Sequence, residues 1–138
     1  MTNFGDVGQF HHRFGLPSVI HDGGPKQPPQ DEELESIMQL RILRMREELE
    51  EFEDAYEDGD QAEMADALVD LVYVVLGTAH VLGYPWEAVW QEVHQANMRK
   101  QRAPSSGEGS RYGNGYDVIK PAGWVAPNVA AVLKRYWK

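Results

Sequence analysis

Residues 47–70, EELEEFEDAYEDGDQAEMADALVD, constrain the fold more than any other stretch of the sequence. At about 100° per residue, the apolar residues from Met38 to Tyr56 recur at helical spacing and define one face of a helix. Glu47, Glu48 and Glu51 fall within one arc, and Glu48 and Glu51 border the apolar face. The pattern therefore predicts a helix whose acidic side chains can point into a helical bundle.

The acidic stretch continues beyond a turn into a second helix. In Asp58-Gly59-Asp60, the glycine suits the end of one helix and Asp60 suits the N-cap of the next. A loop this short predicts antiparallel neighbouring helices. The second helix carries Glu63, Asp66 and Asp70 at spacings of three and four, and the apolar run LVYVVLGTAHVLG follows them.

Converging carboxylates repel one another and require either a cation or partial protonation. Oxygen ligands without cysteine suit a hard ion, here Mg²⁺ or Mn²⁺, and Mg²⁺ commonly takes substrate phosphates as further ligands. Another interpretation is that Asp70 is a structural aspartate, satisfied by a helix N-terminal amide or by Arg44.

The rest of the sequence predicts an all-α protein. We expect one domain made of an N-terminal helix and Pro-rich connector (1–30), a helical core (31–100), and a mobile loop followed by a C-terminal helix (101–138). The helix that carries Asp70 is apolar nearly all round, and two neighbours from its own chain would not cover it. We therefore expect an antiparallel four-helix-type bundle completed by a homodimer, with a tetramer as the alternative.

Charge and motifs exclude several classes of protein. The net charge of -9 disfavours polymeric nucleic acid and anionic membranes as partners. Residues 31–70 hold 16 of the 22 acidic residues, whereas residues 93–138 hold 8 of the 13 lysines and arginines, so a basic segment could face an acidic site. P-loop, dinucleotide-fold and nucleophile-elbow motifs are missing, as is the Glu-x-x-His pair of di-iron bundles. We see no secretory signal and expect a cytoplasmic protein.

The motifs resemble those of the MazG-like all-α nucleotide pyrophosphohydrolases, a group that includes dimeric dUTPases and phosphoribosyl-ATP pyrophosphohydrolase. EELEE at residues 47–51 is similar to the EExxE motif of that family, and Asp70 is similar to the aspartate of its ExxD motif. EVHQANMRK at 92–100, IKPAGW at 119–124 and FHHRFG at 10–15 extend the resemblance over most of the chain. Ala67 departs from it, because the family has a glutamate there.

The resemblance implies hydrolysis of a nucleoside triphosphate to the monophosphate and pyrophosphate, with dUTP or another non-standard nucleotide as the favoured substrate. It implies that Glu48, Glu51 and Asp70 bind Mg²⁺ and that Glu47 orients or deprotonates the attacking water. Asp66 or Glu63 would replace the ligand missing at position 67, and we expect Asp66 to be the better placed. The residues expected to bind substrate are Asn97, Lys100, Tyr73, Arg111 and Lys120, although core packing is the other interpretation for Tyr73. The alternative function is a catalytically inactive helical binding or assembly module.

Overall fold

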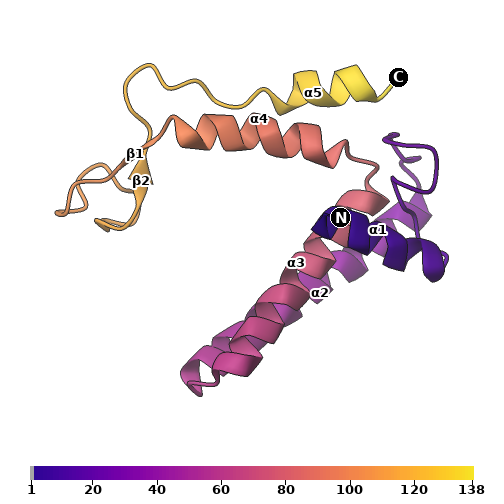
Figure 1. Cartoon of the computed structure of the whole chain (residues 1–138), viewed down its shortest axis with the longest axis horizontal. Coiled ribbons are helices and arrows are strands. Elements are labelled where there is room, and N and C mark those ends of the chain that lie inside the picture. The colour runs from indigo at the N-terminus through magenta and orange to yellow at the C-terminus, as the bar shows by residue number, and fades with distance from the viewer. Residues whose placement is uncertain (1) are drawn as a thin grey trace. The chain divides into compact units, whose positions relative to one another are not determined.

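The computed structural model describes residues 2–138, and within them its regular structure is mostly helical, which confirms the all-α prediction (Figure 1). The helices are α1 (Asn3–Arg13), α2 (Glu32–Glu57), α3 (Gln61–Val81), α4 (Trp86–Met98) and α5 (Val129–Tyr136). Strands β1 (Gln101–Arg102) and β2 (Val118–Ile119) pair antiparallel, with Gln101 opposite Ile119. The chain divides into two compact units: residues up to Pro85 with Trp137 and Lys138, and Trp86–Tyr136. The assignment of the chain to one domain stays a prediction.

The first unit is built on the antiparallel hairpin of α2 and α3 (Figure 1). The Asp31 carboxylate caps α2 by accepting a hydrogen bond from the Leu34 N–H at 2.9 Å. The Asp60 carboxylate caps α3 in the same way, with the Glu63 N–H at 3.1 Å. Between the two helices Gly59 has a φ of 69°, which a residue without a Cβ adopts without strain. The predicted turn is confirmed.

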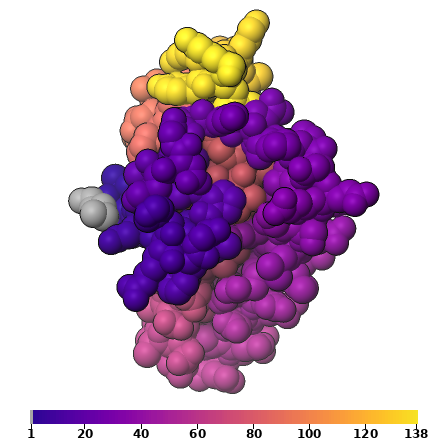
Figure 2. Space-filling view, turned by 90° about the vertical axis from the view of Figure 1, so that its right-hand side faces the viewer, coloured from indigo at the N-terminus to yellow at the C-terminus, as the bar shows by residue number. Residues whose placement is uncertain are grey.

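Helix α1 packs on the C-terminal part of α3 around His80, whose side chain is 2% exposed. The His80 ring stacks on Phe4 with 3.8 Å between ring centroids. Its Nδ1 accepts a hydrogen bond from the Val19 N–H at 3.0 Å, so its Nε2–H donates to the Phe4 carbonyl at 2.9 Å. His80 is therefore a neutral core residue that fastens the N-terminal segment to the hairpin, against which this segment lies in Figure 2.

His11 forms a second buried contact between α1 and the hairpin. Its Nδ1 lies 2.6 Å from the Pro17 carbonyl oxygen, and its Nε2 lies 3.4 Å from Nη2 of Arg41 on α2. Gly77 on α3 makes room for this contact, since a Cβ there would lie 2.6 Å from Nη1 of Arg41 and 2.7 Å from Nε2 of His11. These residues join all three helices of the unit.

A single chain leaves much of the hairpin's apolar surface open. Ala55 is the one buried residue of α2, a helix that the structure describes in full. On α2, Ile42 is 45% and Tyr56 is 67% exposed, and on α3 Val69 is 63% exposed. The apolar face predicted for α2 is thus not enclosed by its own chain. By length and composition alone α3 could also span a membrane, but core helices of soluble proteins share this property, and α3 packs against both α1 and α2.

In the second unit α4 and α5 pack together. The Trp124 Nε1–H donates to the Ala96 carbonyl at 2.8 Å. The Asn128 N–H donates to Oε1 of Glu92 at 2.8 Å, and the Asn128 side chain accepts from the Ala131 N–H at 3.1 Å, close to the start of α5. The predicted loop after Ala103 contains turns and the two-stranded β1–β2 pair, and its mobility stays a prediction.

Candidate metal centre

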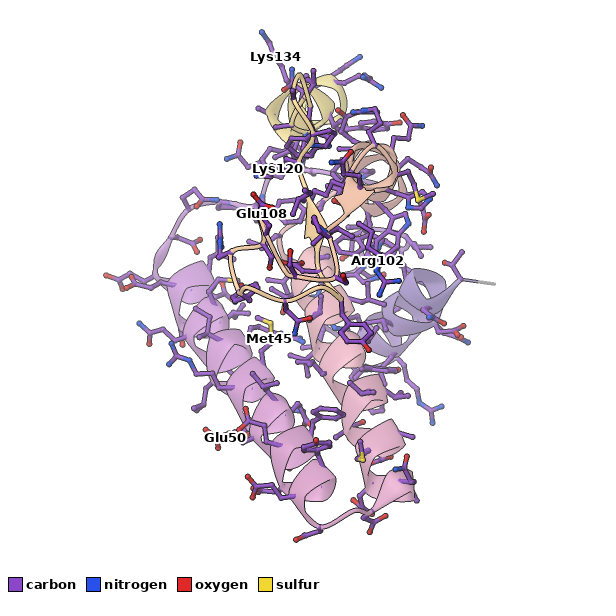
Figure 3. All side chains as sticks on the ribbon, turned by 90° about the vertical axis from the view of Figure 1, so that its left-hand side faces the viewer. Met45, Glu50, Arg102, Glu108, Lys120 and Lys134 are labelled. Atoms are coloured by element: carbon purple, nitrogen blue, oxygen red, sulfur yellow. The ribbon has the colours of Figure 1, made fainter. Side chains whose placement is uncertain are left out.

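Three carboxylates from α2 and α3 converge in the first unit. Glu48 and Glu51 lie one turn apart on α2, and Asp70 lies on the antiparallel helix α3. One oxygen atom of each residue lies within 4.8 Å of the others. Figure 3 shows the same hairpin, with Met45 between the two helices and Glu50 on the outer side of α2. The structure therefore brings together the three residues that the resemblance assigned to metal.

The electrostatics of this carboxylate cluster (Glu48, Glu51 and Asp70) favour the binding of a cation. Burial raises the pKa of Glu48, and a hydrogen bond with Glu51 and the charges of Glu51 and Asp70 raise it further. The Oε2 atom of Glu48 is buried and has no hydrogen-bond partner among the described residues. A buried oxygen without a partner is costly unless a ligand satisfies it. An all-carboxylate set with such an oxygen suits Mg²⁺ or Mn²⁺.

Asp66 adjoins the carboxylate cluster through Asp70. Burial raises the pKa of Asp70 most, followed by the charge of Asp66, a hydrogen bond between the two side chains, and the charge of Glu51. Glu63 lines a neighbouring acidic cavity of about 360 Å³ at the α2–α3 turn, together with Asp66 and the buried Ala67. Of the two predicted replacements for the missing ligand, Asp66 is thus the one in contact with the cluster.

Glu47 and Tyr73 flank the carboxylate cluster along their helices. Glu47 is exposed and does not belong to the group of converging oxygens, although it directly precedes Glu48. Tyr73 follows Asp70 by one turn of α3, and its ring meets Phe10 of α1 edge-on with centroids 5.3 Å apart. This aromatic contact agrees with the packing interpretation of Tyr73, while its position one turn from Asp70 keeps a substrate role open to test.

Arg44 brings a positive charge to the carboxylate cluster. Its charge lowers the pKa of both Glu48 and Asp70, against the larger effects that raise them. Among the described residues 2–138 it forms no close ion pair with a carboxylate. The alternative interpretation, in which Arg44 pairs with Asp70 as a structural ion pair, is therefore not what the structure shows.

Three of the predicted substrate residues meet in the second unit. Lys100, Arg111 and Lys120 line one cavity of about 520 Å³. The ammonium groups of Lys100 and Lys120 lie 5.4 and 5.0 Å from the centroid of the Trp124 ring. Lys120 is labelled in Figure 3, on the segment that leaves β2. Asn97 is exposed near the end of α4 and does not line this cavity.

The comparison with protein families shows the family to which the chain belongs. The family model of phosphoribosyl-ATP pyrophosphohydrolase matches residues 7–97, which include α2, α3 and the carboxylate cluster. The chain belongs to the phosphoribosyl-ATP pyrophosphohydrolase family. The match begins within α1 and ends at Asn97, so most of the second unit lies beyond it.

A curated relative extends the comparison without naming an activity. The chain is 33% identical over 88 residues to an uncharacterized protein of Acanthamoeba polyphaga mimivirus. The matched region is 59% of this chain and 31% of the viral protein, so the chain spans about a third of the length of that relative.

Two features of the site lie outside the EExxE and ExxD motifs. They are the positive charge of Arg44 and the contact between Asp66 and Asp70.

Proposed function

We propose that this member of the phosphoribosyl-ATP pyrophosphohydrolase family hydrolyses a nucleoside triphosphate to the nucleoside monophosphate and pyrophosphate, with Mg²⁺ as the cofactor and Mn²⁺ as a substitute. The observation that carries the proposal is the convergence of Glu48, Glu51 and Asp70 oxygens within 4.8 Å, in a chain of this family. When bound, Mg²⁺ would offset charge on the phosphates and at the reacting phosphorus.

The residues around the carboxylate cluster have separate parts in this reaction. Glu47 orients a water molecule toward the α-phosphorus and accepts its proton. Glu48, Glu51 and Asp70 hold the metal, and Asp66 supplies the carboxylate that Ala67 lacks, while Glu63 is the less favoured replacement. The contact between Asp66 and Asp70 supports this choice.

We further propose that the substrate's anionic groups and sugar are bound by Asn97, Lys100, Arg111 and Lys120, with Tyr73 as an additional contact. The cavity that three of these residues line in the second unit supports a role for them in binding an anion. We favour dUTP or another non-standard nucleotide among the substrates, since the sequence resembles dUTPase-type members of the group.

A homodimer is the proposed working form, with a tetramer as the alternative. Support comes from the open apolar faces of both hairpin helices, on which Leu49 and Val72 are each 47% exposed. Burying a leucine or valine side chain of this kind contributes about 1.5–3 kcal/mol. Several such residues together would stabilise a second copy on this face.

The test is hydrolysis by the full chain, with Mg²⁺ and a panel of nucleoside triphosphates that includes dUTP and phosphoribosyl-ATP. Products are separated by ion exchange, and ³¹P NMR identifies pyrophosphate. We expect monophosphate and pyrophosphate from at least one substrate, loss of the activity in Asp70→Asn, and normal activity in Glu50→Gln, because Glu50 lies on the outer side of α2. Failure to release pyrophosphate from every substrate would refute the proposal.

The second candidate function is an inactive binding or assembly module, and Ala67 at the family's glutamate position favours it. Such a module has lost its metal, so its melting temperature would not respond to Mg²⁺. A melting temperature that rises with Mg²⁺ in the natural chain but not in Asp70→Asn would exclude this alternative.

A further inference from the structure

Two arginines lie on the same side of α2, before the carboxylate cluster. Arg41 and Arg44 are three residues apart, so their side chains are neighbours on the helix surface. Arg41 is half-buried, its Nη2 lies 3.4 Å from Nε2 of His11, and its Nη1 lies so close to Gly77 that a Cβ there would come within 2.6 Å of it. The contacts with α1 and α3 therefore orient the Arg41 guanidinium without a ligand.

Neither arginine is neutralised by an acid close to it. The partner of Arg41 is an uncharged imidazole nitrogen, and residues 2–138 contain no ion pair for either guanidinium. Burial lowers the pKa of Arg41, and the charge of Arg44 lowers it further. A half-buried Arg41 guanidinium beside the like charge of Arg44 and without a counter-ion is unfavourable, and an anion placed between the two groups would relieve it.

The arginine pair, Arg41 and Arg44, adjoins the carboxylate cluster. Arg44 precedes Glu48 by one turn of α2, and its charge acts on both Glu48 and Asp70. A divalent cation on the cluster would cancel carboxylate charge and leave the two guanidinium charges beside it. The surface then offers a metal and an arginine pair side by side, an arrangement that suits a phosphate chain bound to both.

We propose that Arg41 and Arg44 form a binding site for the two terminal phosphates of the substrate, which leave as pyrophosphate. The inference rests on the proposed function and adds residues outside its motifs. In the reaction, the water oxygen bonds to the α-phosphorus, its proton passes to Glu47, and the bond from the α-phosphorus to the bridging oxygen breaks. The electron pair of that bond stays on pyrophosphate, where guanidinium groups stabilise the added charge.

The experiment measures binding of inorganic pyrophosphate to the full chain by isothermal titration calorimetry in the presence of Mg²⁺. Arg44→Gln is the principal variant, because Arg44 is exposed and its replacement should leave the fold intact. Arg46→Gln is the matched control, since it removes the same charge from the same helix about 200° away in angle. We expect pyrophosphate to bind about tenfold or more weakly to Arg44→Gln, and nearly normally to Arg46→Gln.

Two further variants make the result decisive. Arg41→Lys keeps the charge but loses the planar fork, and it should weaken pyrophosphate binding as well. Lys120→Gln reports on the cavity of the second unit. Equal affinities of Arg44→Gln and Arg46→Gln would overturn the proposal, as would a loss confined to Lys120→Gln or no pyrophosphate binding by the natural chain at millimolar concentration. Binding of Mn²⁺ alone, followed by electron paramagnetic resonance, should be retained in Arg44→Gln.

These outcomes separate the arginine pair from the proposed function. If the natural chain hydrolyses no nucleotide but binds pyrophosphate through Arg44, the anion site stands and the hydrolytic function fails. If it hydrolyses a nucleotide, and Arg44→Gln binds pyrophosphate as Arg46→Gln does, the function stands and the anion site fails. In an active enzyme the Arg44→Gln change should also raise the KM for the nucleotide.

Discussion

Replacing Asp70 by asparagine should make the metal-free protein more stable while removing its response to metal. Oxygen atoms of Asp70, Glu48 and Glu51 lie within 4.8 Å of one another, and Asp66 adds a fourth carboxylate. At 4.8 Å two unit charges repel by about 0.9 kcal/mol at a dielectric of 80 and by about 3.5 kcal/mol at 20. Because Glu51 is exposed, we take the lower end for each pair and expect a total of about 1–3 kcal/mol.

Such a gain corresponds to a rise in melting temperature of about 3–10 °C for a chain of this size. The assay is thermal denaturation at low ionic strength, first in EDTA and then in Mg²⁺. In EDTA, Asp70→Asn should melt above the natural chain, and in excess Mg²⁺ the order should reverse, since metal stabilises only the natural chain. Glu50→Gln, on the outer side of α2, should follow the natural chain in both conditions.

The pH dependence of the metal-free protein tests the same reasoning. The pKa of Asp70 and of Glu48 is raised in the folded state above the ordinary values of 3.8 and 4.5. The folded state therefore binds these protons more tightly, and the free energy of unfolding should fall as pH rises from about 4 through the raised values. If Asp70→Asn melts below the natural chain in EDTA at neutral pH, Asp70 serves as a structural acceptor and the electrostatic argument is wrong.

Three further predictions concern the metal centre and the buried contacts of α3 with α1 and α2. Asp66→Asn should weaken Mn²⁺ binding by about tenfold in an electron paramagnetic resonance titration, whereas Glu63→Gln should leave it nearly unchanged; the reverse order would assign the role to Glu63. Below pH 6.5 the protein should lose stability as His80 protonates, because burial lowers its pKa and its Nδ1 already accepts a hydrogen bond, and in acid unfolding His80→Gln should lose this step. Gly77→Ala should lower the melting temperature by about 3–10 °C, although alanine favours helices, since its Cβ would lie 2.6 Å from Arg41; a higher melting temperature would contradict the packing described.

Local signals in the sequence were sufficient to predict the α2–α3 hairpin. Asp31 and Asp60 cap the helices, and Gly59 makes the turn, because capping and positive φ depend on only a few neighbouring residues. Once the turn is fixed, antiparallel packing places Glu48 opposite Asp70, so the carboxylate cluster follows from the spacing of the motifs.

The contacts of α1 could not be predicted in this way. The contact between His11 and Arg41 joins residues 30 apart, and His80 is bonded to Phe4 across 76 positions. The periodicity of the sequence does not predict which histidine is buried, and it does not distinguish His11, which is buried, from His12, which is exposed. Arg41 was therefore missed, although a glycine at 77 in an apolar helix was a signal that another side chain approaches closely there. The apolar residues of α2 that stay exposed are explained by the proposed homodimer, because an apolar pattern does not distinguish burial within one chain from burial against a second copy.

The departure at Ala67 gains a physical account from the contact between Asp66 and Asp70. Ala67 is 3% exposed and lines the acidic cavity beside Glu51, so a glutamate there would extend from a buried Cα toward the cluster. Asp66 has a shorter side chain, but it lies one turn before Asp70, and its proximity raises the pKa of Asp70. A carboxyl group held against Asp70 can occupy the cluster without adding a residue to the core. The hairpin thus carries two carboxylates on each helix, Glu48 and Glu51 on α2 and Asp66 and Asp70 on α3, while the buried position 67 holds only a methyl group. Under the proposed function, Asp66 would take the part of the glutamate that the family has at position 67.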